Sequence, residues 1–135
     1  MKQVAIYIPQ LDYECIFLED AWKVIYGTKE RTIYRDNFYG YPFYAIFNNI
    51  EMVCQQLEII FFKNEVKFSA YFPIELILKD IIEHRQEYWL DLCLDFIIRI
   101  NYLDNNIIGL LNNAKEKKIF SQAVRNKMSA VLKKC

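Results

Sequence analysis

Residues 73–103 read PIELILKDIIEHRQEYWLDLCLDFIIRINYL, with no glycine and no proline after Pro73. Apolar side chains recur through this stretch at steps of three and four residues, the spacing that places them on one face of an α-helix. Pro73 suits a first helical position, where a missing N–H loses no intrahelical bond. Between His84 and Gln86 the apolar stripe slips by about one residue. The stretch therefore predicts either one long helix with a wide buried face or two helices that meet in a bend.

A row of carboxylates follows the same helical spacing. Like charges three or four residues apart destabilise a helix by roughly 0.2–0.5 kcal/mol per pair. A row of acids attracts and orients a partner with a basic surface. The alternatives are a solvated helix face and pairing with basic residues of the same chain. The candidate partner-binding residues in this row are Asp80, Glu83, Glu87, Asp91 and Asp95.

Charge is unevenly distributed, although the net charge of the chain is zero. Residues 115–135 hold seven basic residues and one acid, a net +6, so residues 1–114 carry −6. The acidic body and the basic tail either attract each other or form two separate surfaces. The basic residues of the tail are Lys115, Lys117, Lys118, Arg125, Lys127, Lys133 and Lys134.

Aromatic and basic side chains are mixed in residues 31–44, which show no clean helical or strand period. Tyrosine and arginine are enriched among the residues that dominate protein interfaces. Aromatic rings beside cations are also typical of single-stranded nucleic-acid binding. The alternative is an aromatic cluster that packs under a long loop. The candidate partner-binding anchors are Tyr34, Tyr39 and Tyr41.

The remaining apolar patterns are also mainly helical. Residues 11–26 and 43–62 each carry apolar residues at helical spacing, and Gly27 is well placed to end the first of these helices. Asp104 and Ser121 are expected as N-caps of two shorter helices.

The predicted fold is all-α: a compact, single-domain helical bundle of about five helices over residues 1–135. Only three glycines and three prolines occur, which favours helices over a turn-rich β fold. The alternative is an α+β fold in which residues 3–8, 31–36 and 65–72 form a small sheet.

No motif in the sequence identifies a reaction. The serines lie outside any Gly-x-Ser-x-Gly pattern, the isolated glycines form no phosphate-binding loop, and the four cysteines include no Cys-x-x-Cys pair. His84 is the only histidine. Asp80 and Glu87 can share its helix surface, but a metal site needs a further ligand that the sequence does not provide. We therefore expect no enzymatic activity, no metal and no cofactor.

The segments that direct proteins to membranes are missing from the sequence. No stretch of about 18 uncharged apolar residues is present, and the N-terminus has no long apolar run typical of a signal peptide. We therefore expect no membrane association and a cytoplasmic location.

In size, lack of catalytic residues and surface acidity, the chain resembles the small cytoplasmic immunity proteins that neutralise bacterial toxins, including those of contact-dependent-inhibition and polymorphic toxin systems. Many such toxins are nucleases with basic clefts. The resemblance implies a non-catalytic protein-binding module whose acidic helix face covers the basic cleft of a cognate toxin. The rival functions are a small nucleic-acid-binding or regulatory module that uses the basic tail and the aromatic segment, and an accessory subunit of a larger assembly.

Overall fold

The computed structural model describes residues 4–134. The chain divides into two compact units between Pro73 and Ile74, which we name the sheet unit (residues 4–73) and the helical unit (residues 74–134). The elements of the sheet unit are β1 (Val4–Ile8), η1 (Pro9–Leu11), β2 (Tyr13–Phe17), β3 (Ala21–Tyr26), β4 (Lys29–Tyr34), η2 (Tyr41–Phe43), α1 (Tyr44–Phe47), α2 (Ile50–Ile60) and α3 (Glu65–Tyr71). The helical unit contains α4 (Ile74–Glu83), α5 (Glu87–Ile100), α6 (Asn105–Lys117) and α7 (Gln122–Leu132).

The expectation of an all-α bundle of about five helices is wrong. The described residues form seven α-helices and a four-stranded antiparallel sheet, so the fold is α+β. The single-domain expectation for residues 1–135 stays a prediction.

Residues 11–26 show why the helical period misled. They form β2 and β3, in which Cys15 and Trp22 point to the same face of the sheet. The turn between the strands changes the two-residue alternation into an odd spacing. Cys15 and Trp22 are therefore seven residues apart, as two residues on one face of a helix would be, although both lie in strands. Gly27 does not end a helix. It lies in the two-residue turn between β3 and β4, with a φ of 62° that suits glycine.

The α+β alternative is right about the fold class but only partly right about its strands. Residues 4–8 form β1, residue 3 lies outside the described residues, and the segment 31–36 overlaps β4. Residues 65–72 were expected as a strand but contain α3 instead. The helix begins there because the Asn64 side chain accepts a hydrogen bond of 3.1 Å from the N–H of Lys67.

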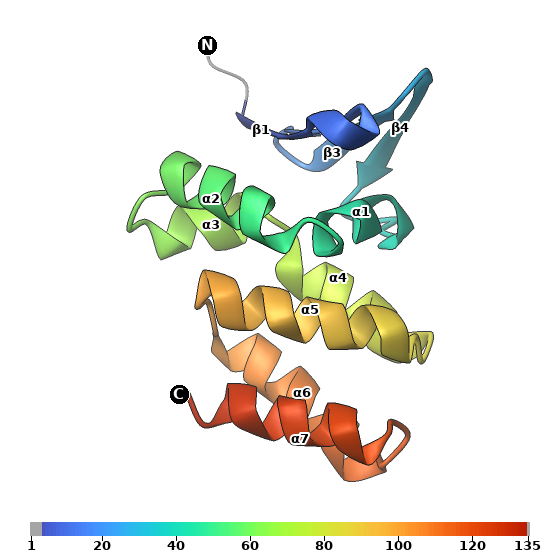
Figure 1. Ribbon diagram of the computed structural model, residues 1–135, viewed down its shortest axis with the longest axis vertical. Helices are drawn as coiled ribbons and strands as arrows, with labels where there is room; N and C mark the ends of the chain where they lie inside the picture. The colour runs from blue at the N-terminus through green and yellow to red at the C-terminus, as the bar shows by residue number, and fades with distance from the viewer. Residues whose placement is uncertain (1–3, 135) are drawn as a thin grey trace. The chain divides into compact units, whose positions relative to one another are not determined.

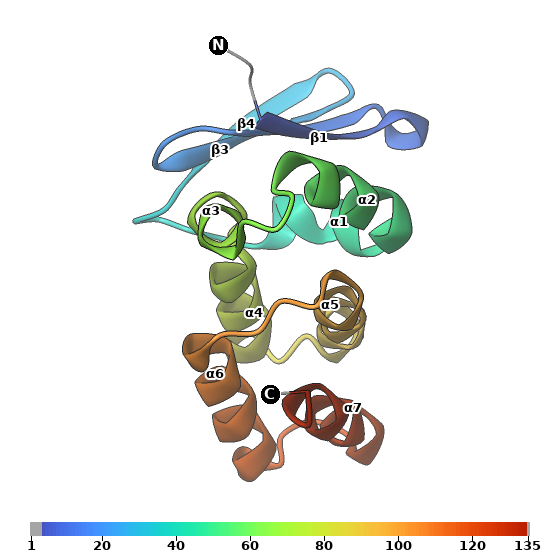
Figure 2. The ribbon, with the colours of Figure 1, turned by 90° about the vertical axis from the view of Figure 1, so that its left-hand side faces the viewer.

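Helices α1, α2 and α3 lie along one face of the sheet (Figures 1 and 2). The strands follow one another in the order β1-β2-β3-β4, and the register places Phe17, Trp22 and Ile33 in one row on the covered face. The ring of Phe17 packs near Phe61 and Phe72, at centroid distances of 6.2 Å each. The core of the sheet unit is therefore an aromatic layer between the sheet and these helices.

Trp22 and Arg35 close the C-terminal end of α3. The indole Nε1 of Trp22 donates a hydrogen bond of 2.7 Å to the carbonyl of Tyr71, and Arg35 donates to the carbonyl of Ala70 at 3.2 Å. The guanidinium carbon of Arg35 lies 5.0 Å from the centre of the Trp22 ring. The last carbonyls of a helix have no partner within the helix, so these bonds satisfy groups that would otherwise need water.

The outer edge of β1 is covered by a side chain. The amide of Gln56 on α2 accepts a hydrogen bond of 2.8 Å from the N–H of Tyr7 and donates one of 2.7 Å to its carbonyl. This pair of bonds reproduces the contacts that a neighbouring strand would make. It fixes α2 against β1 and removes one pairing position from the edge.

We expect Gln56→Leu to destabilise the sheet unit by about 1–3 kcal/mol, because two hydrogen bonds of roughly 0.5–1.5 kcal/mol each are lost. Urea unfolding and amide hydrogen exchange at Tyr7 measure the effect. Gln55→Leu is the matched control, since Gln55 is the exposed neighbour whose hydrogen bond goes to Glu51 on the same helix. Equal stability of the two variants would contradict a role for the Gln56 amide.

The stretch of residues 73–103 contains two helices, α4 and α5, which confirms the bent interpretation over the single long helix. The chain leaves α4 through Arg85, whose φ of 51° is left-handed and ends the helix. The expected N-caps are confirmed. Asp104 accepts a hydrogen bond of 2.9 Å from the N–H of Ile107, and Ser121 accepts one of 3.3 Å from the N–H of Val124.

The apolar faces of the four helices form the core of this unit. Its fully or nearly fully buried side chains include Ile77, Leu78, Ile81, Leu90, Cys93, Leu94, Phe96, Ile97, Ile107, Leu111, Met128 and Val131. Helix α5 packs against both α4 and α7. The face of α5 beside α7 is the one that also carries charge.

Candidate protein-binding surfaces

The row of carboxylates is divided between two helices. Asp80 and Glu83 lie on α4, and the other three acids lie on α5 beyond the bend at Arg85. Both helices belong to the helical unit, so the five residues remain in one compact part of the chain. They do not form one continuous helix face.

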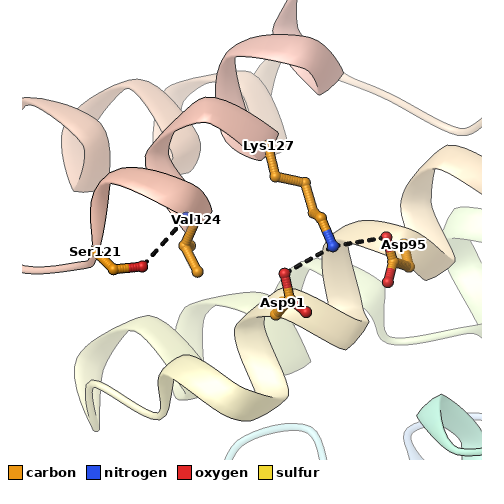
Figure 3. A network of polar contacts seen from close by, with 5 residues as sticks. All are labelled: Asp91, Asp95, Ser121, Val124 and Lys127. Carbon is orange, nitrogen blue, oxygen red and sulfur yellow. Dashed lines mark hydrogen bonds and ion pairs between the residues drawn. The ribbon is translucent and has the colours of Figure 1, made fainter.

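Lys127 of α7 lies between the two acids nearest the C-terminal end of the row (Figure 3). Its Nζ atom is 2.7 Å from Oδ1 of Asp91 and 2.9 Å from Oδ1 of Asp95. The side chain of Lys127 is 27% exposed, and those of Asp91 and Asp95 are 45% and 43% exposed. Burial, the largest single influence, lowers the pKa of Lys127, but the hydrogen bonds and charges of the two aspartates together outweigh it and raise the pKa.

Two further acids of the row also have partners within the chain. The side chain of Glu87 accepts a hydrogen bond from the N–H of Ser121, at the start of α7. Asp80 is paired with His84. The Nδ1 atom of His84 lies 3.3 Å from the carboxylate of Asp80 and 2.8 Å from the backbone carbonyl of Asp80. The hydrogen bond to that carbonyl, and then the charge of Asp80, raise the pKa of the imidazole.

Asp91 and Asp95 therefore pair with a lysine of the basic tail, which is one of the alternatives that the sequence left open. On α5 the row holds α7 in place. The side chain of Glu83 is exposed and makes no hydrogen bond or ion pair within residues 4–134. Binding of a partner by the row stays a prediction, and the charge it offers is smaller than that of five separate carboxylates.

The aromatic segment separates into an inner and an outer set. Phe38 and Phe43 stack at 5.4 Å, and both rings lie edge-on to Trp22 at 5.7 Å and 6.0 Å. These phenylalanines match the alternative of a cluster packed under a loop.

The outer set consists of the tyrosines. Tyr34, at the end of β4, is 56% exposed, Tyr39 in the following loop is 37% exposed, and Tyr41 at the start of η2 is 75% exposed. The same short segment therefore supplies both the core and the three candidate anchors.

The loop that carries Tyr41 is fixed to the sheet unit at its base. The Tyr13 hydroxyl donates a hydrogen bond of 2.8 Å to the carbonyl of Pro42. The ring of Tyr41 lies 5.9 Å from that of the buried Tyr44, at an angle of 64°. A tyrosine held in this way loses little further conformational freedom when it contacts another molecule.

Three exposed apolar side chains, on α2, in the turn after it and on α3, were missed by the sequence analysis. Ile59, Phe62 and Val66 are 80%, 74% and 79% exposed. Ile59 and Phe62 lie outside the apolar stripe expected for residues 43–62, and this displacement is the signal that could have revealed them. Lys63 covers part of the Phe62 ring, because its ammonium lies 5.4 Å from the centre of that ring.

The basic tail forms parts of α6 and α7 rather than an extended arm. Lys127 is engaged by aspartates, and the buried Nε of Arg125 has no hydrogen-bond partner among the described residues. The remaining exposed cations are spread over the two helix ends: Lys117, Lys118, Lys133 and Lys134.

Within the described part of the chain, no group of three or more His, Cys, Asp or Glu side chains is arranged to hold a metal ion. No helix in that part is both long and apolar enough to cross a membrane. No family model, no curated protein and no solved structure matches this chain.

Proposed function

We propose that this chain is a non-catalytic protein-binding module that acts as an immunity protein, neutralising a cognate bacterial toxin by covering a basic surface on it. The observation that carries the protein-binding part is the exposure of Tyr34, Tyr39 and Tyr41 beside the stacked rings of Phe38 and the buried Phe43 in the same segment. The toxin as partner comes from the resemblance in size and composition.

Exposed tyrosines support binding because of their chemistry. Each ring buries a large apolar area on contact, has few rotatable bonds to immobilise, and keeps a hydroxyl that can hydrogen-bond at the rim of an interface. Arg35, between Tyr34 and Tyr39 in sequence, adds a second residue type that is enriched at interface hot spots. The tyrosines are therefore suited to an apolar patch within the basic surface of the toxin.

The carboxylates have a secondary role in the proposal. Glu83 is exposed and has no ion pair within residues 4–134, and the acids paired with Lys127 keep nearly half of their side-chain surface in solvent. Long-range attraction to a basic toxin surface depends on the summed field rather than on single contacts. We assign the acids mainly to the rate of association and the tyrosines to the lifetime of the complex.

The test is protection of growth. Toxin domains encoded beside this gene are expressed in a bacterial host with and without the full chain. Protection is expected with the wild-type chain. The variant Tyr34→Ser/Tyr39→Ser/Tyr41→Ser is expected to lose it, with toxin affinity at least tenfold weaker because hot-spot truncations each remove about 2 kcal/mol.

Tyr7→Ser is the matched control, because Tyr7 is an exposed tyrosine of the sheet unit that does not belong to either set of candidate partner-binding residues. Protection that survives the triple substitution would remove the tyrosines from the interface. Absence of protection against every neighbouring toxin would refute the immunity function. Binding of single-stranded or duplex nucleic acid with a steep salt dependence would favour the rival module.

A further inference from the structure

The two edges of the sheet in the sheet unit are unequal. On β1 the amide of Gln56 bonds the N–H and the carbonyl of Tyr7. Within residues 4–134, no strand pairs with the outer edge of β4, apart from an isolated bridge between Tyr34 and Asn37 where the strand ends. An unpaired edge strand is a template for a further strand, and proteins that do not use such an edge commonly cover it.

The register identifies the groups that β4 offers. Residues opposite each other in an antiparallel pair alternate between bonded and non-bonded positions. The N–H of Arg35 donates to the carbonyl of Asp20 at 3.1 Å, so Ile33 and Arg31 also bond to β3. Glu30 and Thr32 then direct their N–H and C=O groups away from the sheet, as two donor–acceptor pairs for an added strand.

The unpaired charge beside this edge is positive. Lys29 and Arg31 are exposed and lie two residues apart on the same face of β4, and their side chains make no hydrogen bond or ion pair with other described residues. Glu30 points to the opposite face, where its carboxylate lies 3.7 Å from Nζ of Lys23. A strand added here would place its own side chains directly beside two cations.

A second copy of this chain is a poor occupant. Two-fold pairing of β4 with itself, centred on Glu30, opposes Glu30 to Glu30 and Lys29 to Arg31. Centred on Arg31, it opposes two arginines, and centred on Thr32 it opposes Lys29 to Arg35. Like charges directly opposite each other destabilise a strand pair, so the edge disfavours self-association.

We infer that the outer edge of β4 binds an extended segment of a partner protein that carries aspartate or glutamate at alternate positions. The segment adds a fifth strand to the sheet, bonded to Glu30 and Thr32, with its acids facing Lys29 and Arg31. The inference goes beyond the proposed function and shares with it only that the ligand is a protein. It requires neither a toxin nor the acidic row.

The experiment uses the full chain and synthetic peptides with blocked termini. One peptide alternates glutamate with threonine, a second alternates lysine with threonine, and a third is the acidic peptide with N-methyl groups on the amides of one edge. Binding is followed by isotope-edited NMR titration and by amide hydrogen exchange. N-methylation removes strand pairing and leaves the charge unchanged.

The acidic peptide is expected to bind, to protect the amides of Glu30 and Thr32 from exchange, and to bind about tenfold more tightly than the lysine peptide, because two cross-strand charge pairs reverse sign. Arg31→Glu is expected to remove most of that preference. Thr32→Pro, which deletes one outward N–H at an edge position that tolerates proline, is expected to abolish protection. Lys117→Glu on α6 is the control with the same change of charge.

Equal binding of acidic and lysine peptides, equal binding of the N-methylated peptide, or no binding at millimolar concentration would overturn the inference. So would an effect of Lys117→Glu as large as that of Arg31→Glu, or self-association through β4. These outcomes are independent of the growth-protection assay, so failure of the immunity function leaves the edge site standing, and the reverse also holds.

Discussion

Trp22→Ala is expected to destabilise the sheet unit by about 3–5 kcal/mol, the range found when a large buried aromatic side chain is truncated. Trp22 is almost fully buried and lies edge-on to Phe38 and Phe43. Its Nε1 also satisfies the last carbonyl of α3, at Tyr71. Because the total stability of a small domain is about 5–15 kcal/mol, the variant is expected to lose a large share of the free energy of unfolding.

Circular dichroism and amide exchange of the sheet unit measure this effect. Trp22→Phe keeps an aromatic ring but loses the hydrogen bond to Tyr71, so we expect a smaller loss of about 1–3 kcal/mol. Tyr34→Ala is the control on the same sheet. An exposed side chain there is expected to change stability by no more than about 0.5 kcal/mol. A Trp22→Ala variant as stable as the Tyr34→Ala variant would contradict the assigned role.

Lys127→Glu is the second large effect, and it acts in the helical unit. The substitution removes two attractive contacts, with Asp91 and Asp95, and places a third carboxylate between them. These groups are partly exposed, so each contact is screened by solvent, and the expected loss is about 1–3 kcal/mol. Urea unfolding followed by amide hydrogen exchange in α5 and α7 reports this unit directly.

The control for this prediction exchanges the charges at positions 127 and 91. Combining Lys127→Glu with Asp91→Lys restores one opposite-charge contact and is expected to recover part of the loss. Additive effects of the two substitutions would show that the residues do not interact. Raised salt is expected to reduce the difference between the wild-type chain and Lys127→Glu, because screening weakens partly exposed pairs.

The raised pKa of Lys127 gives this contact a defined pH window. An amine whose pKa is higher in the folded chain contributes stability that is fully present below its ordinary pKa of about 10.4. The contribution is lost as pH rises through the folded value. The stability difference between wild type and Lys127→Met is therefore expected to be constant at neutral pH and to shrink in strongly alkaline solution.

The helices of the helical unit could be predicted because their signals come from residues that are close together in the sequence. The apolar stripe of α4 and α5 and the N-caps Asp104 and Ser121 depend only on residues within a turn or two of each other. The sheet could not be predicted in the same way. Cys15 and Trp22 fit a helical step and a strand alternation equally well, and only the pairing of β2 with β3 decides between them.

The candidate site shows the same division between local and distant information. The spacing of Asp91 and Asp95 is a local property, but their neutralisation by Lys127 depends on the packing of α7 against α5. The segregation of Tyr41 from Phe43 depends on where Trp22 lies in the sheet. Composition alone gave the residue types of the surface but not the residues that remain available to a partner.

The three described cysteines lie deep within the two units, Cys15 and Cys54 in the sheet unit and Cys93 in the helical unit. Burial raises the pKa of the Cys15 and Cys93 thiols, and the thiolate is the form that reacts with alkylating reagents. Each unit therefore contains a buried cysteine whose alkylation requires that unit to open. The alkylation rate at each of these cysteines therefore measures how often its own unit opens, so the opening of the two units can be compared without any added label.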